Sequence, residues 1–518
     1  MQDYLFYYPN LASKKNLQKI YKKNQIQIGL DKKEKTKQNS VRKNTVAVVG
    51  VALGDEGKGR LVDNKIESLL KTNGIKSVYV IRFQGGNNTG HTVEKDNIKL
   101  ALHLVPASVM YEKATGIIDR GVLIHPTDLR TEVDYVEKKI NSTLKKRLFL
   151  SDEAILCTDL ERAEEVLNRI KTGKAKGGTG RGVSPAYAHH YDRLGLKVYD
   201  LFDNNWKEIL SSQYEQYQKM FAAFDLKLSD IEVPDYFTTL KSGKETSQKV
   251  GSKKEFIEKL ETGRSWILKR DMIRNTFLLH KESFTDKKIG IIFEGAQAVG
   301  LDPWLGTRPD TTSSNTSSYG IREGTAFWLP EHIEKTIGIF KIVYTSSVGA
   351  RRMPTHVDLP KDLSQLPKNA SKEQKWAAYV REAAHEYGTT TGRPRDITHL
   401  DLAFVTYNAR MSGVKMLSGT HLDIARTEDV IKVCTHYTDK KGNYIPYQPG
   451  LRYQETVFPN YIELPGWDGD KCQKAKKTSD LPENALKFLS FIQAQTGFPI
   501  VAVTTGPQRK NIIPFSGY

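Results

Sequence analysis

Cysteine is scarce in this chain of 518 residues, and long apolar runs are missing. The three cysteines, Cys157, Cys434 and Cys472, are odd in number and lie far apart. Their spacing excludes a disulfide framework and a paired-cysteine zinc site, and it indicates a reducing compartment. No apolar stretch approaches the roughly 18 residues that a membrane-spanning helix needs. We therefore expect a cytoplasmic protein that does not act on membranes.

Charge is plentiful but unevenly placed. The net charge is +18, and residues 1–43 alone hold eleven Lys and Arg against three Asp and Glu. This tail lacks a periodic apolar face and the apolar stretch of a secretory signal, so we predict a basic, disordered extension. Organelle targeting by the tail stays open, although its three acids argue against a transit peptide. Without a basic helix or stacking motif, we expect no nucleic-acid partner.

Short β-branched runs predict strands at 45–49, 78–83, 289–293, 336–344 and 499–503. Helical patterns lie between them, for example at 153–171 and 371–387. Continuous apolar runs suit strands that are covered on both faces. The order predicts an α/β fold with a large, mostly parallel central sheet flanked by helices. We expect a single large domain over 44–518, with a helix-rich lobe at 203–288 and a surface excursion at 357–380.

The glycine-rich turn within residues 46–60 (VAVVGVALGDEGKGR) follows one of these runs. Glycines let backbone N–H groups approach an anion, and Lys58 adds positive charge. The usual phosphate loop is excluded, because six residues separate Gly50 from Gly57 where that motif has four. An acid in such a cradle is costly without a cation or a transferable proton, so Asp55 is a candidate catalytic or metal-binding carboxylate. The alternative is a tight turn with a solvated acid.

A second polar loop, RFQGGNNTGHTV at 82–93, follows the next predicted strand. Asn88 offers donor and acceptor groups to a base or a phosphate, and Gly90 can expose its carbonyl to a cation. His91 could protonate or polarise a leaving phosphate oxygen. The alternative is a purely structural histidine.

Two further loops offer groups for a phosphate and another polar ligand edge. In GGTGRG, Thr179 and nearby amides could hold a monophosphate, with Arg181 and Arg193 as guanidinium partners. After FEGAQ, Gln297 can read an amide or a phosphate, and Thr312 adds a hydroxyl. The alternative here is a set of local Ser/Thr turns.

The last motifs suit a small dicarboxylate and a guanine base. In GTTTGRPRD, Arg393 and Arg395 can each bind a carboxylate through two N–H groups. In LSGTHLD, Asp423 follows a strand-like run and can accept two N–H groups from guanine. TTGPQR at 504–509 closes the last predicted strand. Because ligands gather beyond the carboxyl ends of parallel strands, we expect one shared cleft.

Taken together and in this order, the segments resemble the adenylosuccinate synthetase family from about residue 44 to the C-terminus. The resemblance implies a ligase that converts IMP, L-aspartate and GTP to adenylosuccinate, GDP and phosphate in AMP biosynthesis. The reaction passes through 6-phosphoryl-IMP. The resemblance also implies Mg²⁺ as cofactor and a homodimer with shared active sites.

Individual roles follow from the same resemblance. Asp55 matches the acid that removes the N1 proton of IMP, His91 the residue that assists the leaving oxygen, and Lys58 a phosphate contact. Asp55 and the Gly90 carbonyl would contact Mg²⁺. The residues that would bind IMP are Asn88, Thr179, Arg193 from the partner subunit, Gln297 and Thr312. Those that would bind aspartate are Thr391 and Arg393. The residues on the GTP side are Gly54, Glu56, Gly57, Gly59, Arg395, His421, Asp423, Thr504 and Gly506.

Departures from the family pattern leave alternatives open. His421 stands where the guanine motif has lysine, so the choice between GTP and ATP is not fixed. Ser346-Ser347 and Arg351-Arg352-Met353 alter a loop that lies near the IMP ribose in the family. A phage branch joins dGMP to aspartate and has a small residue in place of the catalytic acid, so the retained Asp55 favours IMP. A catalytically silent nucleotide-binding paralogue is the remaining alternative.

Overall fold

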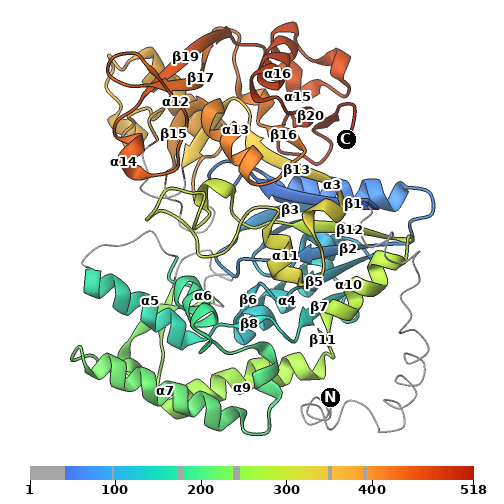
Figure 1. Ribbon diagram of the computed structural model, residues 1–518, viewed down its shortest axis with the longest axis vertical. Helices are drawn as coiled ribbons and strands as arrows, with labels where there is room; N and C mark the ends of the chain where they lie inside the picture. Colours follow the sequence, from blue (N-terminus) through green and yellow to red (C-terminus); the bar gives the residue numbers. More distant parts are fainter. Residues whose placement is uncertain are drawn as a thin grey trace.

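The computed structural model describes residues 41–95, 98–172, 179–236, 246–347, 353–388, 392 and 394–518. A ten-stranded sheet crosses its centre (Figure 1). Neighbouring strands pair in parallel except β20 and β21, which confirms the predicted α/β class. In spatial order the strands are β11 (Ile273–Arg274), β7 (Leu148–Ser151), β5 (Ala114–Ile118), β2 (Ser77–Arg82), β12 (Ile289–Glu294), β1 (Arg42–Gly50), β13 (Ile333–Lys341), β16 (Met416–Thr420), β20 (Ile500–Thr504) and β21 (Ile512–Pro514).

The central strands are apolar throughout because both faces of the sheet are covered. Along β1, Ala47 and Val49 pack into one apolar core, whereas Val46 and Val48 pack into another on the opposite face. Helices cover both faces, as the continuous apolar runs predict. The helices α3 (Lys58–Lys71) and α4 (Pro126–Ile140) pack on the Val46 side, and α11 (Gly320–Thr325), α13 (Leu402–Met411) and α16 (Glu483–Thr496) on the other.

The first strand starts earlier than the predicted domain boundary at residue 44. β1 begins at Arg42, whose side chain is buried. The Arg42 guanidinium donates to the carbonyls of Asp286 and Ile289 at 2.7 and 2.8 Å. These bonds fix the start of the strand against the end of α10 (Thr276–Thr285). Residues 1–40 of the predicted basic extension lie outside the described residues.

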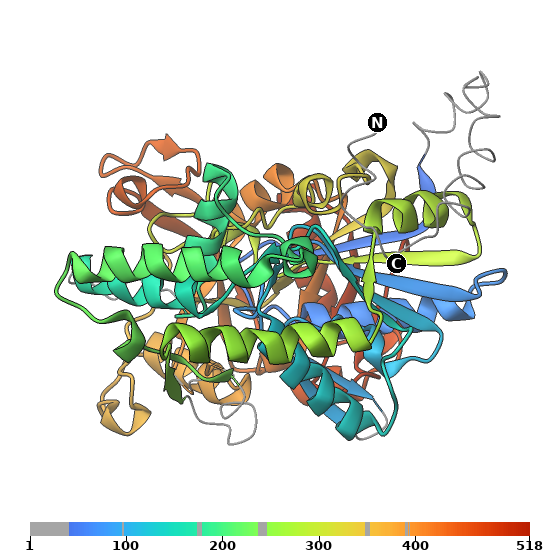
Figure 2. The same cartoon turned by 90° about the horizontal axis from the view of Figure 1, so that it is seen from below.

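A helical lobe lies at one end of the sheet, at the bottom of Figure 1, and its long helices face the viewer in Figure 2. α7 (Trp206–Ala222) and α9 (Lys253–Lys269) form its long helices and share an apolar core with α5 (Asp159–Thr172). The predicted lobe at 203–288 therefore omitted α5. The last part of that range contains β11 and α10, which belong to the central sheet and its cover. The helix predicted over 153–171 starts only at Asp159, because β8 (Ile155–Leu156) pairs with β6 (Leu123–Ile124). α6 (Val183–Asp192) packs beside α5.

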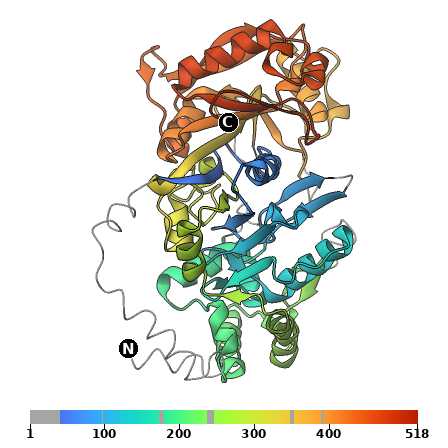
Figure 3. The same ribbon diagram turned by 90° about the vertical axis from the view of Figure 1, so that its right-hand side faces the viewer.

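A second lobe lies beyond the other end of the sheet (Figure 3). Its sheet contains β14 (Tyr344–Ser347), β15 (Asp396–Asp401), β17 (Val430–Thr438), β18 (Tyr444–Ile445) and β19 (Phe458–Pro465). The single strand predicted at 336–344 is thus wrong, since its run spans β13 and the start of β14, which belong to different sheets. Near this lobe lie α14 (Leu451–Gln454) and α15 (Gly469–Lys474).

The predicted surface excursion at 357–380 is wrong in its second half. α12 (Lys372–Ala383) buries Trp376, Ala377 and Val380 in the main core. Two hairpins complete the strands, β3 (His91–Lys95) with β4 (Ile98–Leu102) and β9 (Glu232–Pro234) with β10 (Ser247–Lys249). Of the helices in the described ranges, none has the length and apolar character that crossing a membrane requires.

Candidate active site

The predicted motifs lie at one edge of the central sheet. They follow the carboxyl ends of β2, β12, β1, β16 and β20, and these strands are neighbours except that β13 separates β1 from β16. Asn88 follows β2, Gln297 follows β12, Asp55 follows β1, Asp423 follows β16 and Gly506 follows β20. The order places Asn88 and Gln297 on one side of Asp55, and Asp423 and Gly506 on the other.

The turn after β1 is left-handed at three of its residues. Gly54, Asp55 and Gly57 have φ angles of 95°, 53° and 86°. Glu56 lies buried inside the turn, where it accepts from the Gly54 N–H at 2.7 Å and pairs with Lys58 Nζ at 2.6 Å. The lysine that the sequence assigns to phosphate is therefore paired within its own loop, and Glu56 supports the turn.

Asp55 is the first residue of a network in which acidic and basic side chains alternate. Its carboxylate pairs with Arg395, whose other terminal nitrogen bonds to Glu386 at 2.9 Å. Glu386 is buried and also bonds to Lys341 and to the Tyr344 hydroxyl. Burial raises the pKa of Asp55, but Arg395 and Lys341 outweigh it and hold the pKa below its usual value. Asp55 is therefore ionised at neutral pH, and 41% of its side chain is exposed to solvent.

His91 lies on the IMP side of Asp55, in a buried position at the start of β3. Its Nε2 is 3.2 Å from a Glu294 oxygen, without the alignment of a hydrogen bond, and its Nδ1 is 3.4 Å from Arg82. Burial and the Arg82 charge hold the pKa of His91 well below its ordinary value, so the ring is neutral. The charge of Lys58 lowers the pKa of both His91 and Asp55, which shows that it reaches both electrostatically.

Three of the five predicted IMP residues carry a buried oxygen with no hydrogen-bond partner among the described residues. These atoms are Asn88 Oδ1, Gln297 Oε1 and Thr312 Oγ1. Gln297 has a φ of 52°, and its Nε2 donates to Thr89 at 3.0 Å, which fixes the side chain. A buried polar atom without a partner costs about 1–3 kcal/mol. Oxygens from three separate segments are therefore left unsatisfied by the described part of the chain, as expected of groups that pair with a ligand.

The other two predicted IMP residues lie at either end of one segment. Thr179 is exposed at the start of the loop that leads into α6. Arg193 ends that helix with a φ of 71° and is also exposed. The predicted aspartate ligands Thr391 and Arg393 lie outside the described residues.

On the guanine side, most of the predicted groups already have partners. Asp423 accepts a hydrogen bond from Gln473 at 3.1 Å, and burial raises the pKa of its carboxyl group. The Gly506 carbonyl accepts from Arg60 at 2.6 Å. The His421 N–H donates to the Thr504 hydroxyl at 3.3 Å.

The His421 ring occupies an aromatic and cationic corner. It meets Tyr344 edge to face at a centroid distance of 5.8 Å. Burial and the nearby Lys341 lower the pKa of His421 to about 4, so the imidazole is neutral. A neutral ring beside Tyr344 can stack on a base without adding charge.

The comparisons with known proteins agree with this arrangement. A family model for adenylosuccinate synthetase matches residues 47–513. The chain belongs to the adenylosuccinate synthetase family. Adenylosuccinate synthetases from Exiguobacterium sp. and Caldicellulosiruptor bescii are 31% and 33% identical to it. Each alignment covers 90% of this chain and 98% of the relative.

Solved structures support the same family. The fully ligated adenylosuccinate synthetase from Plasmodium falciparum superposes with a TM-score of 0.74 at 28% identity, covering 91% of this chain and 100% of that one. The succinoaminodeoxyadenylate synthetase of cyanophage S-2L, bound to dGMP and dATP, has a TM-score of 0.50 at 15% identity, covering 90% and 94%. The phage protein shows likeness of fold alone.

Membership in the adenylosuccinate synthetase family gives the chain its activity. Like its relatives, the chain is a GTP-dependent ligase that joins IMP to aspartate in purine biosynthesis. The predicted family and reaction are thereby confirmed. Sequence reasoning missed residues that support the site from a distance. These are Arg60, Lys341, Tyr344, Glu386 and Gln473. The positions of Arg60, directly after GDEGKG, and Glu386, just before GTTTGRPR, were the available signals.

Proposed function

We propose that Asp55 is the base of this synthetase. Its ionised, half-exposed carboxylate takes the proton from N1 of IMP, so that O6 can attack the γ-phosphorus of GTP. The P–O bond to GDP breaks and 6-phosphoryl-IMP forms. The amine of aspartate then attacks C6 and forms the C6–N bond. The C6–O bond breaks, and inorganic phosphate leaves. Arg395 pairs with Asp55 Oδ2, and the second carboxylate oxygen can face N1 of IMP.

Lys58 and His91 assist at the phosphates. Lys58 can exchange its pairing with Glu56 for a phosphate oxygen, where its charge stabilises the transferring group. His91 is neutral and can donate from Nε2, since Arg82 can only donate to the other ring nitrogen. On the IMP side, the unpartnered oxygens of Asn88, Gln297 and Thr312 support contacts to IMP.

The residues at the site fit Mg²⁺. Asp55 and the Gly90 carbonyl would supply oxygen ligands, and a Cβ placed on Gly90 would meet no atom of the described residues within 4 Å, which leaves room beside it. Within the described ranges, no group of three or more His, Cys, Asp or Glu side chains could hold a metal. Mg²⁺ commonly binds through one or two carboxylates, waters and substrate phosphates, so a full protein cage is not needed. When bound, the ion neutralises phosphate charge.

We also propose a cytoplasmic homodimer in which Arg193 completes the partner subunit's IMP site. Arg193 lies between two exposed apolar side chains, Tyr191 and Leu194, and an apolar surface of this kind suits a protein contact. Mixing inactive Asp55→Asn and Arg193→Ala proteins tests the sharing of sites. Mixed dimers should regain activity, since one of their two sites then has both residues. A mixture that stays inactive would count against shared sites.

Two observations carry these assignments: three predicted IMP residues each have an oxygen without a partner in the described residues, and an ionised Asp55 follows the strand next to that of Gln297. Phosphate release is the decisive assay, with IMP or dGMP paired with GTP or ATP in the presence of aspartate and Mg²⁺. We expect turnover with IMP and GTP. Activity confined to dGMP would indicate the phage-type reaction, and nucleotide binding without phosphate release would indicate a silent paralogue.

A further inference from the structure

The helix α5 buries a row of charged side chains. Asp159, Arg162 and Glu165 are spaced three residues apart, and their relative exposures are 1%, 0% and 9%. Residues at this spacing share a helix face, and buried charges of this kind need partners. The partners of Arg162 and Glu165 lie in or near the two loops that carry Asn88 and Thr179.

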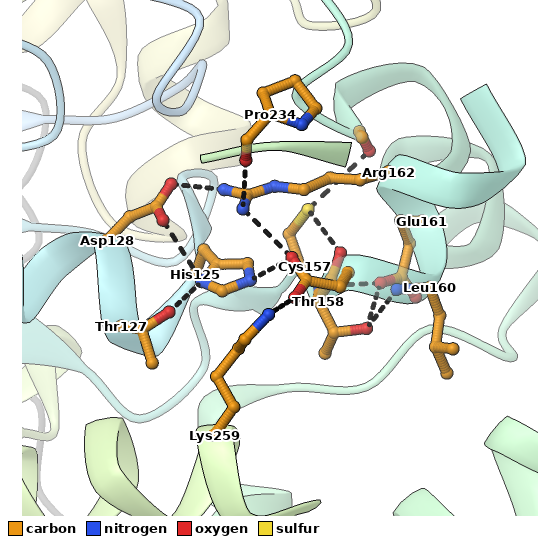
Figure 4. A network of polar contacts seen from close by, with 12 residues as sticks. His125, Thr127, Asp128, Cys157, Thr158, Leu160, Glu161, Arg162, Pro234 and Lys259 are labelled. Carbon is orange, nitrogen blue, oxygen red and sulfur yellow. Dashed lines mark hydrogen bonds and ion pairs between the residues drawn. The ribbon is translucent and has the colours of Figure 1, made fainter. Parts of the chain in front are cut away.

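Arg162 is connected to the first of these loops through Asp128, at the start of α4 (Figure 4). Its guanidinium bonds to Asp128 Oδ2, and the same oxygen accepts from the side-chain amide of Asn87. Asn87 is buried and directly precedes Asn88, whose own Oδ1 has no partner in the described part of the chain. Arg162 therefore fixes the residue next to a proposed IMP ligand.

Glu165 holds the second loop one helical turn further on. Its two carboxylate oxygens accept from the N–H groups of Gly180 and Gly182 at 2.9 and 2.8 Å. Gly182 packs directly on the helix, because a Cβ there would lie 2.9 Å from the backbone nitrogen of Arg162. One helix face thus holds the backbone just after Thr179 and, through Asp128, the side chain of Asn87 just before Asn88.

The remaining carboxylate of the row is paired as well. Asp159 bonds to Arg162 at 3.1 Å, to His125 at 3.2 Å and to Lys259 of α9 at 2.6 Å. Burial raises the pKa of Asp128, but Arg162 and the other polar neighbours together outweigh burial and hold the pKa below its usual value, so the Asp128 carboxylate stays charged. A buried ion pair adds little net stability compared with apolar side chains of similar volume. Stability alone therefore gives a weak reason for this arrangement, whereas fixed geometry between two loops gives a direct one.

We propose that Arg162 and Asp128 are positioning residues for IMP, which hold the Asn88 loop and the Thr179 loop at a fixed separation. The proposal rests on the proposed function, in which Asn88 and Thr179 contact IMP. Neither Arg162 nor Asp128 is assigned a contact with substrate. Their removal should weaken IMP binding and leave GTP binding unchanged, since the guanine residues lie across Asp55 on other strands.

The test replaces the pair by apolar side chains, Asp128→Leu with Arg162→Met, so that no uncompensated charge is left between them. We expect KM and the calorimetric Kd for IMP to rise about tenfold, while KM for GTP changes less than about twofold. The matched control is Asp401→Asn with Tyr437→Phe, another buried pair that lies in the other lobe. The control should lower the melting temperature and leave both KM values unchanged.

An unchanged affinity for IMP would overturn the proposal, as would equal rises in both KM values. If the double variant does not fold, Arg162→Lys keeps the charge but loses the fork that reaches Asp128 and Asp159 together. It should raise KM for IMP about threefold, and an unchanged KM would again overturn the proposal. Wild-type protein separates the two levels of inference. If it fails to bind IMP, the proposed function and the positioning role both fall, but normal turnover with an unaffected double variant rejects the positioning role alone.

Discussion

The IMP side and the guanine side of the site differ in how their polar groups are satisfied. On the IMP side, the oxygens of Asn88, Gln297 and Thr312 are buried without partners in the described residues. On the guanine side, Asp423 and the Gly506 carbonyl already have donors, although the Thr505 hydroxyl is buried and unpartnered. The IMP side thus keeps free acceptors at a cost in stability, whereas the guanine side must exchange existing bonds for those to a base.

This difference has consequences for binding and for mutations. A preformed set of unpartnered groups loses little freedom when its ligand arrives, which favours tight and selective binding. A set of groups that already have internal partners must break those hydrogen bonds first. Its binding free energy is therefore only the difference between the new hydrogen bonds and the old ones. Mutations on the IMP side should therefore lower the affinity for the ligand and leave the free energy of unfolding unchanged. Mutations on the guanine side should change both quantities.

The largest effect is expected at Asp55, between the two sides. Asp55→Asn removes the base but suits the left-handed backbone, because asparagine tolerates a positive φ. We expect kcat to fall about 1000-fold or more, with a change in unfolding free energy below about 1 kcal/mol. Steady-state kinetics and urea unfolding measure the two quantities. Near-normal turnover would remove Asp55 from its proposed role.

Asp423→Asn tests the guanine side. Asparagine replaces one of the two carboxylate oxygens by an NH2 donor and cannot accept two guanine N–H groups side by side. We therefore expect kcat/KM for GTP to fall about 100-fold and the preference for GTP over ATP to shrink. Competition between the two nucleotides measures this preference. The same ratio in variant and wild type would contradict a guanine contact at Asp423.

The same aspartate predicts a pH dependence. Burial raises the pKa of Asp423, so the carboxyl group gains its proton at a higher pH than an ordinary aspartate. The protonated form is a poorer acceptor, and KM for GTP should therefore rise as the pH falls. Asp423→Asn should remove this acid dependence of KM. A wild-type KM that does not change with acidification would argue against the assignment.

Asn88→Ala tests the IMP side against its neighbour. We expect KM for IMP to rise about tenfold with no loss of stability, because the Asn88 oxygen has no hydrogen bond to lose within the described structure. Asn87→Ala is the matched control. Asn87 bonds to Asp128, so its removal should lower the melting temperature. Equal losses of stability in the two variants would contradict an unpartnered Asn88 oxygen.

Much of this comparison could be predicted from local sequence. Four loops can be recognised from the sequence, because glycines and polar residues directly follow apolar strands. They carry Asp55, Asn88, Gln297 and Asp423. Their meeting at one sheet edge follows from parallel pairing. The residues that hold these loops in place could not be predicted in the same way. Arg60 and Gly506 are 446 positions apart, and no local pattern reports such a contact.

The misplaced elements have a similar cause. The run at 336–344 is interrupted only by Lys341, yet the chain leaves one sheet at that lysine and enters another at Tyr344. In α5, charged residues such as Arg162 would ordinarily indicate a solvated face, and only tertiary pairing explains their burial. The sequence therefore predicts which loops bind ligands, but it is silent on what holds the loops in place.

The smallest predicted effect runs in the opposite direction to the others. Gln473 is exposed, and its side chain occupies the Asp423 oxygen that guanine would use. Gln473→Ala should lower KM for GTP about twofold to fivefold, since a typical net hydrogen bond is worth roughly 0.5–1 kcal/mol. Lys474→Ala, at the neighbouring exposed position of α15, is the control and should leave KM for GTP unchanged. A higher KM in Gln473→Ala would mean that Gln473 orients Asp423 rather than competing for it, and the guanine side would then be as preformed as the IMP side.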